Sequence, residues 1–200
     1  MNTQRKLHSV DIFETPEEIQ RHLKSLQDAF KPLRKFAKIS CWHINDKENM
    51  AMWLNYQGTE KGIVIQSTPE KLSNTVGPYR IKPEYGEETI YAGNVKYINY
   101  ELDSMSDRYG FLTPFFYKRT NYEYEQEFRM IISLREASEF GVEIPEKGIL
   151  VPFNYKAGIE KVILSPHSDE SYVKKAEELF TQYNAESPIE KSQIAKQPRY

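Results

Sequence analysis

Three stretches of the chain carry apolar residues at helical spacing. The first begins at a cap-and-proline signal at Thr15 and runs to Leu33, with His22 on its apolar face as a packing residue. The second covers residues 47–56, where helix formers continue without a breaker. The third follows an acidic cap in residues 168–183. The pattern therefore predicts an N-terminal helix, a short Trp-containing helix and a C-terminal helix.

Short apolar or alternating runs between these helices predict strands. Residues 88–102 alternate well enough for one long strand with a bulge at Gly93, which we favour over a pair of strands. Together the runs indicate an α+β fold with a central, mostly antiparallel sheet, in a single domain over residues 1–200 whose ends (1–15 and 186–200) are peripheral. The expected strands lie within residues 37–46, 62–67, 88–102, 118–132, 148–153 and 159–166.

Composition narrows the classes of function. A net charge of −2 gives no general attraction for phosphate backbones, so a nucleic-acid partner is not expected. The local basic group formed by Lys31, Arg34, Lys35 and Lys38 is interpreted as the outer face of a helix. One cysteine excludes an internal disulfide, and four scattered histidines offer no zinc-ligand spacing. With no membrane-spanning run and no signal-peptide core, we expect a bacterial-type cytoplasmic protein.

Candidate functional side chains are most concentrated in KRTNYEYEQEFR, residues 118–129, which combines aromatic residues with three acids and three bases. A strand here would place side chains alternately on two faces. The face expected to be buried carries Tyr122, Tyr124, Gln126, Phe128, Met130 and Ile132. The face expected to be chemically active carries Glu123, Glu125, Glu127, Arg129 and Ile131.

Two interpretations of the acidic face remain open. Carboxylates two residues apart on a strand lie about 7 Å from each other. In a partly shielded site they repel by about 2 kcal/mol, which favours protonation of one of them. A carboxyl tuned in this way can act as a general acid or base. The alternative is a structural face on which the glutamates simply pair with neighbouring Lys and Arg side chains.

Aromatic residues form a second candidate feature. We expect Trp42 and His43, at the end of a strand, to converge with Trp53 and Tyr56 on the following helix. Such a cluster can line a ligand cleft, or it can form an ordinary core of Met and Trp side chains.

These features together resemble a widespread bacterial family of domains of unknown function. The resemblance covers roughly residues 38–195. It rests on the segments Ser40-Cys41-Trp42-His43, Met52-Trp53 with Tyr56, Gly62-Ile63 with Ile65, and Lys118-Arg119 with Tyr122, Glu125, Glu127 and Arg129. Relatives typically begin with an aromatic and basic strand segment that has no counterpart here. The resemblance implies a fold and a site but no established activity.

The sequence supports two hypotheses for function. In the first, the domain has a cleft for a small molecule or a protein partner, lined by the acidic face and the aromatic residues, and needs no cofactor. In the alternative, it is an ADP-ribosyltransferase-like enzyme acting on NAD, an activity that would suit a toxin or phage-defence system. The candidate catalytic residues are Glu125, Glu127 and His43. The candidate binding residues are Trp42, Trp53, Tyr56, Lys118, Arg119, Tyr122 and Arg129.

Overall fold

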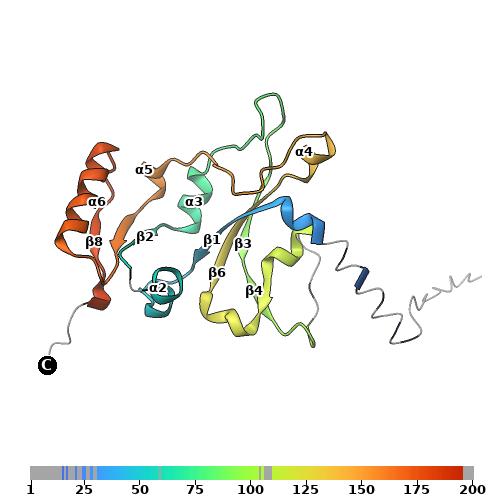
Figure 1. Cartoon of the computed structure of the whole chain (residues 1–200), viewed down its shortest axis with the longest axis horizontal. Coiled ribbons are helices and arrows are strands. Elements are labelled where there is room, and N and C mark those ends of the chain that lie inside the picture. Colours follow the sequence, from blue (N-terminus) through green and yellow to red (C-terminus); the bar gives the residue numbers. More distant parts are fainter. Residues whose placement is uncertain are drawn as a thin grey trace, which may run out of the picture.

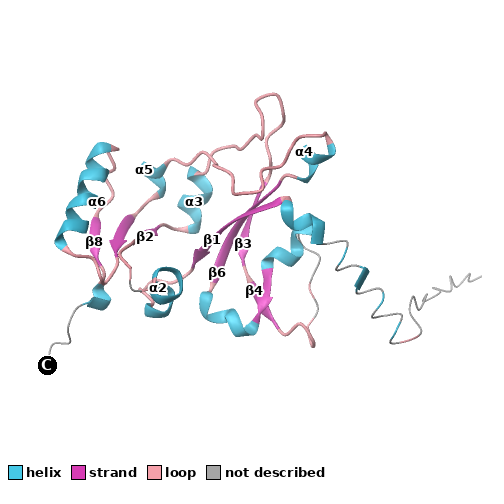
Figure 2. Ribbon diagram, viewed as in Figure 1, coloured by secondary structure: helices cyan, strands magenta, loops and turns pink. Residues whose placement is uncertain are grey.

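The computed structural model confirms an α+β fold (Figures 1 and 2). It describes residues 31–58, 60–103, 105 and 110–195, together with Thr15, Glu17, Arg21, Lys24, Ser25 and Asp28. Most of the helix predicted from Thr15, including His22, therefore lies outside the described residues. The strands are β1 (Ala37–His43), β2 (Ile63–Gln66), β3 (Ile90–Asn94), β4 (Lys96–Ile98), β5 (Tyr117–Arg119), β6 (Glu127–Ser133), β7 (Lys161–Leu164) and β8 (Ile189–Lys191).

The helices include the predicted Trp-containing and C-terminal ones. The first, α2, starts at an asparagine cap, Asn49, whose side chain accepts from the Ala51 N–H at 2.9 Å. The α-helices are α2 (Met50–Gln57), α3 (Pro69–Thr75), α4 (Arg135–Glu139), α5 (Tyr155–Gly158) and α6 (Glu170–Gln182). The 3-10 helices are η1 (Lys31–Lys35), η2 (Gly110–Phe116), η3 (Thr120–Glu125) and η4 (Gln193–Ala195).

The central sheet has the order β1-β6-β3, with both pairs antiparallel. Its middle strand, β6, is buried on both sides, since Phe128 and Ile132 on one face and Glu127 and Ile131 on the other are shielded from solvent. The segment from η2 to β5 packs on the Ile131 face and forms the main core with it. That core consists of Leu112, Phe116, Tyr117 and Ile131, bordered by Ala37, Ile98, Phe111 and Phe115.

A second sheet lies beside the first and has the order β2-β7-β8. The pair β2-β7 is antiparallel and β7-β8 is parallel. Figure 1 shows α6 running alongside β8, at the end of the molecule opposite β3 and β4. β1 is an edge strand of the first sheet and lies on the side toward the second sheet. Likewise, β2 is an edge strand of the second sheet and lies on the side toward the first (Figure 1). Within the described residues, no hydrogen-bonded ladder joins these two edges.

Three predicted strands differ from the observed ones. Residues 118–132 are not one strand, because η3 and Gln126 interrupt it; Gln126 has a left-handed backbone, with φ of 40°. Consequently Tyr122 and Tyr124, which were expected to be buried, are exposed. Residues 88–102 split into β3 and β4, which belong to different sheets. The N–H of the intervening residue 95 donates to the Glu127 carbonyl at 2.8 Å.

The segment 148–153 also forms no strand. It makes a single antiparallel bridge, between Phe153 and Val76. Pro152 contributes to this outcome, because a proline has no N–H to donate to a ladder. Instead of joining a sheet, this segment passes over one face of the central sheet and helps to enclose a cavity there.

Candidate functional site

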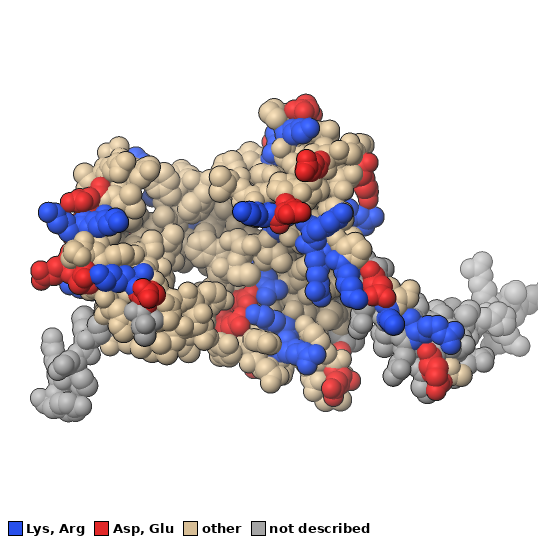
Figure 3. All heavy atoms as spheres, in the orientation of Figure 1, with Lys and Arg blue, Asp and Glu red and all other residues tan. Residues whose placement is uncertain are grey.

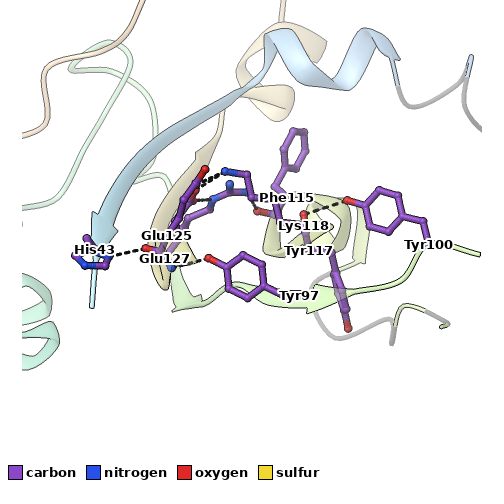
Figure 4. A network of polar contacts seen from close by, with 9 residues as sticks. His43, Tyr97, Tyr100, Phe115, Tyr117, Lys118, Glu125 and Glu127 are labelled. Atoms are coloured by element: carbon purple, nitrogen blue, oxygen red, sulfur yellow. Dashed lines mark hydrogen bonds and ion pairs between the residues drawn. The ribbon is translucent and has the colours of Figure 1, made fainter. Parts of the chain in front are cut away.

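Four charged side chains predicted for the site form one ion-paired cluster, and three of them are labelled in Figure 4. Lys118 on β5 lies between the two acids: its Nζ is 2.7 Å from Glu127 Oε1, and it also contacts Glu125 Oε2. On the same strand as Glu127, Arg129 donates from Nε to Glu127 Oε2 at 2.5 Å. Its guanidinium also donates to the Phe115 carbonyl at 2.5 Å. The acids are therefore neutralised by the neighbouring cations.

Burial makes this cluster electrostatically strong. Glu125 is 8% exposed and Glu127 is 5% exposed. Burial acts to raise the pKa of Glu127, but hydrogen bonds with Glu125, Arg129 and Lys118 outweigh it and lower that pKa to about 2. The pKa of Glu125 is raised, first by burial and then by its hydrogen bond with Glu127. Burial opposes the charge of Lys118, yet its bonds to both acids raise its pKa.

The surroundings of the cluster hold its geometry. The hydroxyl of Tyr97 accepts a hydrogen bond from the Glu127 backbone N–H at 2.8 Å, and Figure 4 shows this ring reaching the strand from β4. Across the sheet, Cys41 pairs with Arg129. Although the residue as a whole is exposed, the pKa of the Cys41 thiol is raised, first by desolvation and then by the Glu127 charge. Such a thiol is not activated as a nucleophile.

The predicted aromatic residues line a cavity of about 610 Å³ between the two sheets. We call it the inter-sheet cavity. Trp42 and His43 contribute from the end of β1, and Trp53 and Tyr56 contribute from α2. The opposite wall is β2, all four of whose residues line the cavity, together with Ser67, which follows the strand. Because both faces of a strand contribute, the unpaired edge of β2 must border this space.

The aromatic side chains differ in how much surface they offer. Trp53 is 6% exposed and its indole N–H is held by Glu48 at 3.1 Å, so it forms a fixed wall. Tyr56 is 72% exposed, and Trp42 is partly exposed with its indole N–H donated to Ser40. Accessible aromatic surface in the inter-sheet cavity therefore comes from Tyr56 and Trp42.

His43 connects the cavity with the charged cluster. Its Nδ1 lies 2.7 Å from the Glu125 carbonyl oxygen, and because a carbonyl can only accept, Nδ1 carries the hydrogen (Figure 4). In a neutral ring, Nε2 is then an acceptor. This atom is buried and has no hydrogen-bond partner among the described residues.

Residues 52–130 match the model of a family described as "Protein of unknown function (DUF2971)". The matched segment runs from α2 to β6. It includes Trp53, Tyr56 and the four members of the charged cluster, whereas Trp42 and His43 precede it. No curated protein and no solved structure matches the chain. The comparison thus supports similarity to a family of unknown function and adds no activity.

The site predicted from the sequence is therefore divided in two. Four residues, Trp42, His43, Trp53 and Tyr56, line the inter-sheet cavity, while Lys118, Glu125, Glu127 and Arg129 form the adjacent charged cluster and do not line it. The two groups adjoin, because burial and then the charges of Glu125 and Glu127 raise the pKa of Tyr56. The remaining two belong to neither group, although Tyr122 contacts the charged cluster. Arg119 stacks over the Tyr100 ring at 5.4 Å, and Tyr122 lies under the Lys118 ammonium at 4.9 Å.

Neither metal binding nor membrane insertion is indicated by the described part of the chain. Within those residues, no three His, Cys, Asp or Glu side chains are grouped so that they could hold a metal ion. No helix there combines the length and the apolar character that crossing a membrane requires.

Glu48 is a cavity residue that the sequence did not single out. Its carboxylate accepts hydrogen bonds from Trp53, from the Ser192 hydroxyl at 2.6 Å and from the Gln193 N–H at 2.7 Å. It thereby ties the start of α2 to the segment after β8. No local signal could reveal this contact, because Ser192 lies 144 positions along the chain.

We expect Glu48→Ala to lower the free energy of unfolding by about 1–3 kcal/mol, because the buried Trp53 and Ser192 donors would lose their acceptor. Urea unfolding followed by tryptophan fluorescence measures this loss. Glu143→Ala removes an exposed glutamate and serves as the matched control, with an expected change within about 0.5 kcal/mol. Equal stability of the two variants would show that Glu48 does not hold the cavity wall.

Proposed function

We propose that this domain binds a small molecule with a planar aromatic group in the inter-sheet cavity, without carrying out chemistry on it. The observation that supports this best is the division of the site. The aromatic residues border a cavity of about 610 Å³, a size typical of ligand pockets, while both candidate acids are ion-paired away from its lining. A carboxylate held by Lys118 and Arg129 is poorly placed to exchange protons with a ligand.

The chemistry of the lining defines the class of ligand. Tyr56 and Trp42 provide accessible aromatic surface for stacking. The polar part of the lining includes the amides of Asn49, Gln57 and Gln66 and the Lys161–Glu190 ion pair, which spans 2.9 Å. In addition, a ligand N–H that reached His43 Nε2 would supply the partner that this atom lacks. These groups fit a planar heterocycle with hydrogen-bonding edges, such as a nucleobase or a nicotinamide.

Calorimetric titration with adenosine, ATP, NAD and nicotinamide tests this proposal. We expect at least one of them to bind saturably to the wild type. Tyr56→Ala should weaken that binding by about 1–3 kcal/mol, the usual contribution of one base stacked on an aromatic side chain. Tyr183→Ala, which removes an exposed tyrosine at the end of α6, is the matched control and should bind like the wild type. Absence of binding across the panel, or equal binding by Tyr56→Ala, would contradict the proposal.

A second candidate is ADP-ribosyl transfer from NAD, and one observation favours it. Glu125 and Glu127 belong to the same cluster, yet the pKa of the first is raised and that of the second is lowered. Active sites that use one carboxyl as an acid and the other as an anion show the same separation. Release of nicotinamide from NAD by the wild type, and not by Glu127→Gln, would favour this candidate. Binding of NAD without release would favour the binding role.

A further inference from the structure

A second cavity, of about 500 Å³, lies on the opposite face of the central sheet from the charged cluster. We call it the sheet-face cavity. Its floor is formed by β1, β6 and β3, and the segment 146–153 and α3 close its sides. The floor and sides are mainly apolar, and they include Leu72, Val76, Ile90, Met130, Ile132 and Phe153.

One end of this cavity is strongly basic. Arg34, Lys35, Lys38 and Lys147 line it, with Glu146 as the acidic residue among the lining side chains. Figure 3 shows Lys and Arg side chains gathered over η1 and the start of β1, the part of the molecule that holds three of them. The basic group that the sequence placed on the outer face of a helix thus continues onto the rim of a cavity.

The charges on this rim are not neutralised by acids within the described residues. Lys38 donates to the Pro145 carbonyl at 2.5 Å, which leaves its charge uncompensated. Lys35 lies 4.7 Å from the centre of the Phe36 ring. Neither Arg34 nor Lys147 forms an ion pair with any described residue. An anionic group would therefore find up to four cations at this end of the cavity.

We propose that the sheet-face cavity binds a single-chain alkyl carboxylate, a fatty acid, with its carboxylate at the basic rim and its chain along the apolar floor. The order of residues along β1 supports this orientation. Lys38 pairs with Ile132, and Ser40 pairs with Met130 further from the rim. Trp42, two residues further along β1 and paired with Phe128, lines the cavity on the side away from Lys38. The lining therefore changes from charged at the rim to apolar further along the cavity. A fatty acid changes in the same way from its carboxylate to its alkyl chain.

This site is separate from the one in the proposed function. Trp42 lines both cavities, but the basic rim belongs to the sheet-face cavity alone, and Tyr56 belongs to the inter-sheet cavity alone. Either binding proposal can therefore be contradicted by experiment while the other holds. Tyr56→Ala is expected to leave fatty-acid binding unchanged.

Calorimetric titration with decanoate, kept below its micelle concentration, tests the proposal. We expect saturable binding of one decanoate per chain. Hexanoate should bind more weakly, by about fourfold for each CH₂ removed, because each buried CH₂ contributes to transfer from water. Decyltrimethylammonium has the same chain with a cationic head and should bind at least tenfold more weakly than decanoate, and added salt should reduce that difference.

Two charge-matched variants locate the site. Lys38→Gln/Lys147→Gln should lower the affinity for decanoate about tenfold. Lys174→Gln/Lys175→Gln changes the net charge equally on the exposed face of α6 and should bind decanoate like the wild type. No binding of decanoate, equal binding of the cationic amphiphile, equal binding of hexanoate, or equal affinities of the two double variants would each overturn the proposal.

Discussion

Glu127→Gln is expected to lower the free energy of unfolding by about 3 kcal/mol at neutral pH, because it removes the anion that Lys118 and Arg129 share in a buried site. The substitution keeps the shape of the side chain, so the loss reports charge. Chemical unfolding at pH 7 measures it. Glu123→Gln, in the preceding η3, is the control and should change stability by less than about 0.5 kcal/mol, since Glu123 is exposed.

Glu127→Gln should also change how the free energy of unfolding depends on pH in the acid range. The pKa of Glu127 is about 2 in the folded protein against an ordinary 4.5, so folding favours its ionised form. The ionised Glu127 contributes about 3 kcal/mol to the free energy of unfolding. This contribution is complete above pH 4.5 and is lost as the pH falls toward 2. Wild type and Glu127→Gln should therefore become equally stable near pH 2. A difference that persists unchanged at low pH would contradict this assignment of the charge.

Lys118→Met is expected to lower the free energy of unfolding at pH 8 by about as much as Glu127→Gln does at neutral pH, because it removes the cation of the cluster instead of an anion. It leaves two buried carboxyls beside each other without the cation that lies between them. Glu125, whose pKa is already raised, should then hold a proton in the folded state that it releases on unfolding. Because the folded state binds more protons, the variant should gain stability relative to the wild type as the pH falls from 8 to 5.

Unfolding in urea at pH 8, 6.5 and 5 measures this trend. Lys96→Met, which removes an exposed lysine from the neighbouring strand β4, is the control and should follow the wild type at every pH. A loss of stability in Lys118→Met that does not vary with pH would mean that packing of the lysine stem, rather than its charge, stabilises the cluster.

The parts of the site that could be predicted depend on signals close together in the sequence. Trp42 and His43 precede α2 by a few residues, so a strand, a turn and a helix over residues 37–57 suffice to bring them to Trp53 and Tyr56. The pairing of Glu125 and Glu127 with Lys118 and Arg129 is the structural alternative that the charge pattern already offered.

Other features depend on contacts that no local pattern reports. Nothing about Gln126 signals a left-handed backbone, yet its conformation ends η3 and starts β6, so the predicted alternation over residues 118–132 is wrong before Glu127. Residues 88–102 have a strand pattern throughout, but the two sheets they enter are defined by partners elsewhere. The apolar run 148–153 is typical of a buried strand, and it is instead the side of a cavity.

The absence of a ladder between β1 and β2 in the described residues has a mechanical consequence. The angle between the two sheets is set by side chains and by α2, which are softer than a continuous backbone network. The inter-sheet cavity lies across this joint, with Trp42 and His43 on one side and β2 on the other. A ligand bound there would contact residues of both sheets, so its binding should reduce the motion of one sheet relative to the other.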